Sequence, residues 1–306
     1  MIVTNAITPL HLSGNTTELQ GRLLLDILKQ AVDEAWRSSI EVLDLQSAQV
    51  VIDHAKDVRA EVAALIVDAI QHRTVSDKYK DEETGSNRVY PPTYKVRSVE
   101  AQVTELKKHF PKLGTCMEKL GRRPLPGGAE AWFAIPRWEA LAPTYSEAIE
   151  LVLAVIASKR KLQNRIPGKL GPTHLRQSER SKLAEKILAD QQAGSDILVV
   201  AAQVGLLHRG CSARRTRVKM YGNEFGLGVF AFACILLTHP ERLSSSDTLM
   251  IDCSGDEYSV RGDSTFDRVP LFDYDISGIE LSIFYEDRSR NLWGTPTGFV
   301  YKMVQD

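Results

Sequence analysis

A basic segment near the middle of this 306-residue chain has the residue types best suited to bind phosphate. Residues 209–219 carry five positive side chains and no acidic one: Arg209, Arg214, Arg215, Arg217 and Lys219. Guanidinium groups suit phosphate because their forked N–H donors bind two oxygens at once. We therefore predict that this segment binds DNA, RNA or another polyanion. It would hold backbone phosphate without reading base sequence.

The charge of the whole chain hides this segment, because the net charge is only -1. Residues 159–219 carry 14 basic and 4 acidic side chains, whereas residues 220–306 carry 6 and 14. The first region therefore has a net charge of +10 and the second of -8. The basic segment could instead be a solvated loop, or form ion pairs with the acidic C-terminal third. Seven further basic residues would widen the patch if the fold gathered them: Lys159, Arg160, Lys161, Arg165, Lys169, Arg176 and Arg180.

An acidic turn follows a predicted strand and carries Asp252, Asp256 and Glu257. Carboxylates at a strand end can hold Mg²⁺ beside a phosphate substrate. The alternative function is therefore a metal-dependent phosphoryl-transfer enzyme, such as a nuclease, with the arginines holding phosphate. It requires the acidic turn and the basic segment to line one cleft. A plain acidic turn is the simpler interpretation, and we favour it.

Other patterns do not decide whether the protein is an enzyme. Glycines at 222, 226 and 228 precede an apolar helix, but their spacing matches no nucleotide-binding motif. Close packing of helix on sheet also explains them, and we favour that interpretation. The seven histidines are scattered, and we expect a structural role for His208 beside the basic segment.

The elements that position these residues indicate an α/β or α+β fold, with an N-terminal helical region followed by a mixed sheet and packed helices. We predict a helical region at 1–75, a polar loop or linker at 76–96, and a mixed α/β domain at 97–306. Apolar runs predict a strand at 196–202, a buried helix at 226–237 and a strand at 248–252. These would form a right-handed βαβ unit. The basic segment would then be a loop at the carboxyl end of a strand, where open α/β sheets bind ligands.

Further periodic segments predict helices at 98–110, 145–161 and 176–192. Short apolar runs predict strands at 132–135, 269–274, 279–285 and 298–303, the last three antiparallel at the end of the sheet.

Cysteine use and hydropathy bear on where the protein works. The four cysteines form no C-x-x-C pair and no zinc-binding spacing, which favours a reducing, cytoplasmic location. The longest apolar stretch, 227–237, is too short to cross a membrane, so we expect a soluble protein without a membrane partner. Apolar stripes on the N-terminal helices could form a dimer seam. A third possible function is therefore a non-enzymatic oligomeric scaffold, or a subunit of a larger assembly.

Overall fold

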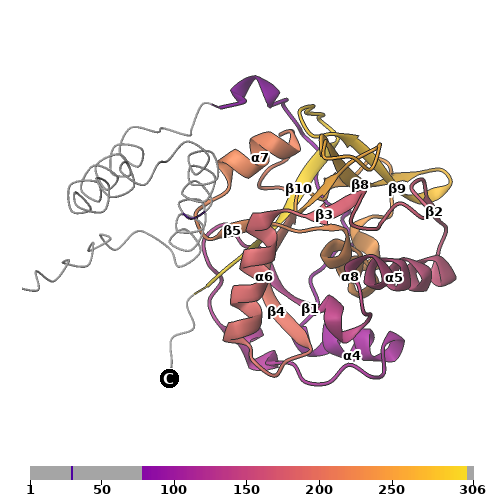
Figure 1. Ribbon diagram of the computed structural model, residues 1–306. Coiled ribbons are helices and arrows are strands. Elements are labelled where there is room, and N and C mark those ends of the chain that lie inside the picture. Colours follow the sequence, from indigo (N-terminus) through magenta and orange to yellow (C-terminus); the bar gives the residue numbers. More distant parts are fainter. Residues whose placement is uncertain (1–28, 30–77, 302–306) are drawn as a thin grey trace, which may run out of the picture. The chain divides into compact units, whose positions relative to one another are not determined.

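The computed structural model describes Lys29 and residues 78–301 (Figure 1). The chain divides into two units, residues 1–77 and 78–306. The predicted helical region at 1–75 and its dimer seam lie outside the described residues. With the exception of Lys29, every described residue belongs to the second unit.

A ten-stranded mixed sheet runs through this unit (Figure 1). Its strands are β1 (Ala131–Pro136), β2 (Leu162–Asn164), β3 (Leu175–Gln177), β4 (Ile197–Gly205), β5 (Glu224–Gly226), β6 (Met250–Asp252), β7 (Asp256–Tyr258), β8 (Arg268–Asp275), β9 (Gly278–Tyr285) and β10 (Trp293–Phe299). The main path of the sheet follows the order β1, β4, β10, β6, β8, β7 and β3. In addition, β5 pairs with β10, and β9 pairs with both β8 and β2.

Four of the five α-helices among the described residues begin at a residue whose side chain caps them. Ser98, Ser178 and Ser212 each accept a hydrogen bond from a backbone N–H in the first turn, and Thr144 forms a capping box with Glu147. No helix of the described residues is long and apolar enough to cross a membrane. The helices are α4 (Val99–His109), α5 (Tyr145–Lys159), α6 (Glu179–Gln191), α7 (Ala213–Lys219) and α8 (Val229–Thr238), with short 3-10 turns η2 (Lys80–Glu82), η3 (Glu118–Arg122), η4 (Trp138–Ala140) and η5 (Pro240–Arg242).

The predicted fold class is confirmed, because helices pack on a mixed sheet. The predicted βαβ unit is wrong. β10 lies between β4 and β6, antiparallel to the first and parallel to the second, so β4 and β6 run in opposite directions. The pairing of β10 depends on contacts distant in sequence, which a local pattern does not reveal. The basic segment also differs from the predicted loop, because its second half forms α7 after the Ser212 cap.

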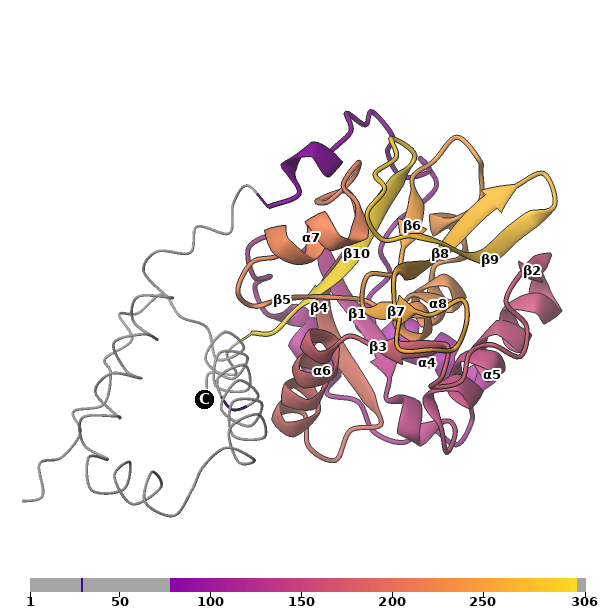
Figure 2. The ribbon, with the colours of Figure 1, turned by 45° about the horizontal axis from the view of Figure 1, so that its top comes forward.

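Residues 78–96 contain the short 3-10 turn η2 and are fastened to the sheet domain. The Thr84 N–H donates to Gly210 O at 2.7 Å, and the Leu249 N–H donates to Val89 O at 3.1 Å. Tyr90 Oη donates to a carboxylate oxygen of Glu130 at 2.7 Å. Figures 1 and 2 both show the start of this loop beside α7. The loop therefore takes part in the fold of the second unit.

Arg242 is a fully buried cation that joins two strand ends. Its Nε and Nη2 donate to Val204 O at the end of β4, and its Nη1 donates to Leu249 O before β6. Its guanidinium also lies 4.4 Å from the centre of the Tyr90 ring. Burial lowers the pKa of Arg242, so carbonyl oxygens and aromatic faces must replace the lost water.

We expect Arg242→Lys to lower the free energy of unfolding by about 2 to 4 kcal/mol, because an ammonium group cannot reproduce the forked contacts. Urea denaturation measures this loss. Arg261→Lys, at an exposed position, is the matched control and should change the free energy of unfolding little. Equal stability of the Arg242→Lys variant and the wild type would contradict the role given to Arg242.

Candidate functional site

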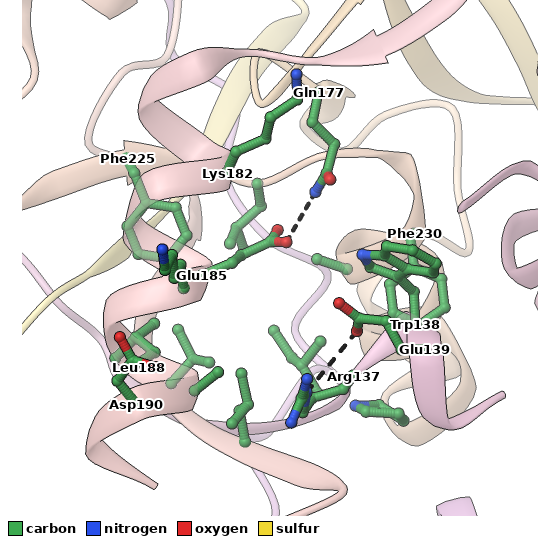
Figure 3. Close-up of a pocket in the computed structure, with 18 of the residues that line it drawn as sticks. Arg137, Trp138, Glu139, Gln177, Lys182, Glu185, Leu188, Asp190, Phe225 and Phe230 are labelled. Atoms are coloured by element: carbon green, nitrogen blue, oxygen red, sulfur yellow. Dashed lines mark hydrogen bonds and ion pairs between the residues drawn. The ribbon is translucent and has the colours of Figure 1, made fainter. Parts of the chain in front are cut away.

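A pocket of about 700 Å³ lies between α6, the strands β1 and β4, and the beginning of α8 (Figure 3). We call it the α6–α8 pocket. Its volume lies in the range of small-molecule sites, which span roughly 300 to 1,000 Å³. Much of its wall is apolar and comes from Ile135, Leu188, Leu198, Val200, Phe225 and Phe230.

The carboxyl group of Glu185 lies in this largely apolar pocket. Figure 3 shows its side chain pointing from α6 into the pocket, where it accepts a hydrogen bond from Gln177 Nε2 at 2.8 Å. Burial raises the pKa of Glu185 to about 8, and the nearby carboxylates of Asp256 and Glu139 act in the same direction. The carboxyl group is therefore mostly protonated at neutral pH, and can donate an O–H.

The rim of the pocket opposite α6 is formed by η4 and the residue before it. Figure 3 shows Trp138 and Glu139 across the pocket from Glu185. Arg137 Nε lies 3.8 Å from Glu139 Oε2, so this charge pair largely cancels. Arg137 and Glu139 thus offset each other's charge, while the Trp138 indole offers a flat surface on which a ring can stack.

Asp256 holds the start of α8, and with it one wall of the pocket. The N–H of Val229 donates to Asp256 Oδ2 at 2.7 Å, and Tyr145 Oη donates to Oδ1 at 3.1 Å. The N-cap residue of α8, Gly228, has no side chain, and a Cβ there would lie 2.6 Å from Asp256 Oδ1. Close approach of the carboxylate thus explains this glycine. Burial raises the pKa of Asp256 to about 7.

Three of the five predicted phosphate-binding residues form ion pairs with the loop that begins the described unit. Arg214 Nε lies 2.8 Å from Glu82 Oε1. Arg215 Nε and Lys219 Nζ both contact Glu83, at 2.6 and 3.1 Å. Burial on one side and these two cations on the other act on the Glu83 carboxylate, and its pKa is lowered overall. The basic segment is therefore balanced mainly by Glu82 and Glu83, and much less by the C-terminal third.

The remaining two predicted phosphate-binding residues, Arg217 and Arg209, differ in their exposure and in their contacts. Arg217 Nη1 forms an ion pair with Glu286 Oε2 at 2.5 Å, the one pair that joins these five residues to the acidic C-terminal third within the described chain. Arg209 is exposed and donates from Nη1 to Arg88 O at 3.2 Å. A polyanion at this segment would compete with carboxylates already in place, and binding there stays a prediction.

The basic segment and the acidic turn do meet, but through the backbone. Arg217 Nε donates to Ser254 O and its Nη2 donates to Asp256 O, both at 3.1 Å. The carboxylates themselves lie elsewhere. Glu257 accepts from Arg176 Nε at 2.8 Å, and Asp252 is buried with no hydrogen-bond partner for its Oδ1.

The proposed magnesium ligands Asp252, Asp256 and Glu257 are therefore not gathered around one point. Across residues 78–301, no three His, Cys, Asp or Glu side chains form a group that could hold a metal ion. His208 has the structural contact that the sequence favours, since it is buried with its Nε2 2.7 Å from Glu224 Oε1. The geometry gives the nuclease alternative no support.

Glu185 was not predicted from the sequence, although a signal was present. The buried face of α6 consists of Ser181, Ala184, Ile187 and Leu188. Glu185 follows Ser181 by four residues and precedes Leu188 by three, so it lies on the apolar side of its helix. An acid on that side must be paired, protonated or directed into a cavity.

Asp252 also makes stability depend on pH. Burial raises the pKa of Asp252 to about 8 from an ordinary value of 3.8. The folded protein therefore keeps a proton that the unfolded chain loses, and the free energy of unfolding falls as pH rises from about 4 to about 8. We expect Asp252→Asn to remove up to about 1.4 kcal/mol per pH unit of this slope. Urea denaturation at about pH 5, 6, 7 and 8 measures it.

Asp247→Asn is the control for this measurement, because the Asp247 side chain is 91% exposed. It should keep the slope of the wild type. An Asp252→Asn variant with that same slope would show that Asp252 is ionised in the folded protein.

No protein-family model matches the chain, and neither does any curated protein or any solved structure.

Proposed function

We propose that the protein binds a small, uncharged organic molecule in the α6–α8 pocket. The observation that carries this proposal is the carboxyl group of Glu185, held inside a largely apolar pocket. Pockets of this size that combine apolar walls with a few polar groups of shifted pKa are typical of ligand sites. We infer a ligand with a ring or other apolar body.

The protonation state of Glu185 indicates which polar group the ligand carries. Below about pH 8 this side chain is a hydrogen-bond donor, since its pKa is raised to about 8. A carbonyl oxygen or a ring nitrogen would accept that bond. A strongly charged ligand fits less well, because much of the wall is apolar and Arg137 and Glu139 offset each other's charge at the rim. Gln177 fixes the carboxyl group from the other side.

Benzamide is a suitable first probe, because it joins an aromatic ring to a carbonyl acceptor. We expect saturation-transfer NMR and calorimetry to detect binding by the wild type. The affinity should fall about tenfold per pH unit above pH 8, as the donor proton is lost. Glu185→Gln keeps an N–H donor at every pH, so its affinity should stay nearly constant over this range.

A second pair of variants tests the location. Ala189 lies on the pocket wall and is partly exposed, so Ala189→Trp should fill the pocket and abolish binding. Ala157→Trp places the same side chain on an exposed position of α5 and should bind as the wild type does. Binding that survives Ala189→Trp would place the ligand elsewhere. A wild-type affinity independent of pH would contradict the role of Glu185.

A further inference from the structure

We propose that a phosphate group binds in a second hollow, at the amino end of α6. This hollow has a volume of about 340 Å³, and we call it the arginine hollow because three arginines line it. They come from different parts of the chain: Arg176 from β3, Arg180 from α6 and Arg217 from α7. Of these, Arg217 belongs to the five residues for which the sequence predicts phosphate binding.

Arg180 provides the positive charge that the protein leaves least balanced here. Its Nε donates to Glu224 O at 2.7 Å and its Nη2 donates to Tyr221 O. Among the described residues, no carboxylate forms an ion pair with it. Burial lowers the pKa of Arg180, which reflects the cost of keeping this cation away from water. An anion in the hollow would supply the missing counter-charge.

The two acidic residues that line the arginine hollow, Glu179 and Glu257, form ion pairs with other residues and not with Arg180. Glu257 is paired with Arg176 at 2.8 Å, and Glu179 is paired with Lys182 at 2.7 Å. Arg217 in turn is paired with Glu286 and held on the carbonyls of the 252–257 turn. After these pairs are formed, Arg180 has no ion-pair partner among the described residues, and the Glu224 carboxylate acts on it only from a longer distance.

The backbone adds to the positive electrostatic potential in the hollow. The hollow includes Ser178 and Glu179, the N-cap and first residue of α6, a helix of 13 residues. The amino end of a helix carries a partial positive charge and N–H groups without helical partners, both of which favour phosphate.

Ser254 gives independent evidence for a ligand. It is 1% exposed, it lines the hollow, and its Oγ has no hydrogen-bond partner in the described structure. The hydroxyl lies beside another wall residue, since a Cβ on Gly226 would be 2.6 Å from Ser254 Oγ. A buried hydroxyl without a partner costs stability, so a phosphate oxygen that bonds it would recover part of that free energy.

A small phosphate compound fits this hollow better than a nucleic acid does. Nucleic acids bind along a track of cations that contacts successive phosphates. The neighbouring cations Arg214, Arg215 and Lys219 are paired with Glu82 and Glu83. The arginine hollow therefore offers one phosphate position, suited to inorganic phosphate or a phosphomonoester.

The test measures thermal stabilisation and calorimetric binding by inorganic phosphate, with sodium chloride at matched ionic strength as the reference. We expect a saturable rise in melting temperature for the wild type. Arg180→Gln and Ser254→Ala should each weaken binding about tenfold, because each removes a group that contacts the anion. Ala189→Trp should bind phosphate normally, since it blocks only the α6–α8 pocket.

Ser254→Ala tests the proposal even if Arg180→Gln folds poorly. The Ser254 hydroxyl has no partner to lose, so without phosphate this variant should be as stable as the wild type or slightly more stable. Arg261→Gln and Ser264→Ala, at exposed positions, are the matched controls. Stabilisation by chloride equal to that by phosphate would overturn the proposal, as would unchanged phosphate binding by Ser254→Ala.

Binding of a fluorescein-labelled oligothymidylate tests whether the arginine hollow is part of a nucleic-acid surface. We expect no binding that depends on Arg180. Oligothymidylate binding that Arg180→Gln abolishes, with no binding of inorganic phosphate, would overturn the proposal in favour of a nucleic-acid surface.

Discussion

The described unit depends above all on the burial of α8. All ten residues of this helix are buried, so every side of it must be covered. α4, α5 and β1 pack against it. Its amino end has no capping side chain of its own, and Asp256 supplies the acceptor from a distant turn. This carboxylate therefore holds the amino end of α8, which forms one wall of the α6–α8 pocket.

Most charged and polar groups in the unit satisfy one another, which makes the exceptions informative. Glu82 and Glu83 neutralise much of the basic segment, and Arg242 is surrounded by carbonyl oxygens. Glu185 and Arg180 also form no ion pair among the described residues, but unlike Arg242 each of them lines an open hollow. They lie on the same helix, one facing each hollow. Groups left unbalanced beside open space are those whose partners a ligand can provide.

Local patterns predicted most elements, but not the pairing or the sites. The helices at 98–110 and 145–161 and the strand at 196–202 are confirmed within a few residues as α4, α5 and β4. The prediction that the last strand lies at the end of the sheet is wrong, because β10 pairs between β4 and β6. The uneven distribution of charge along the sequence indicated the basic segment at 209–219. It could not predict that Glu82 and Glu83, in the loop at 78–96, form ion pairs with that segment. Glu185 was missed because its pKa depends on burial that only tertiary packing creates.

The ionisation of Glu185 in the protein without ligand tests the proposed function most directly. Carbon-13 NMR of the side-chain carboxyl, assigned by comparison with Glu185→Gln, follows this one group through a pH titration. Burial in the α6–α8 pocket predicts a midpoint of about 8. A midpoint close to the ordinary value of 4.5 would show that the carboxyl group is solvated and charged at neutral pH. That result would remove the hydrogen-bond donor on which the proposed function depends.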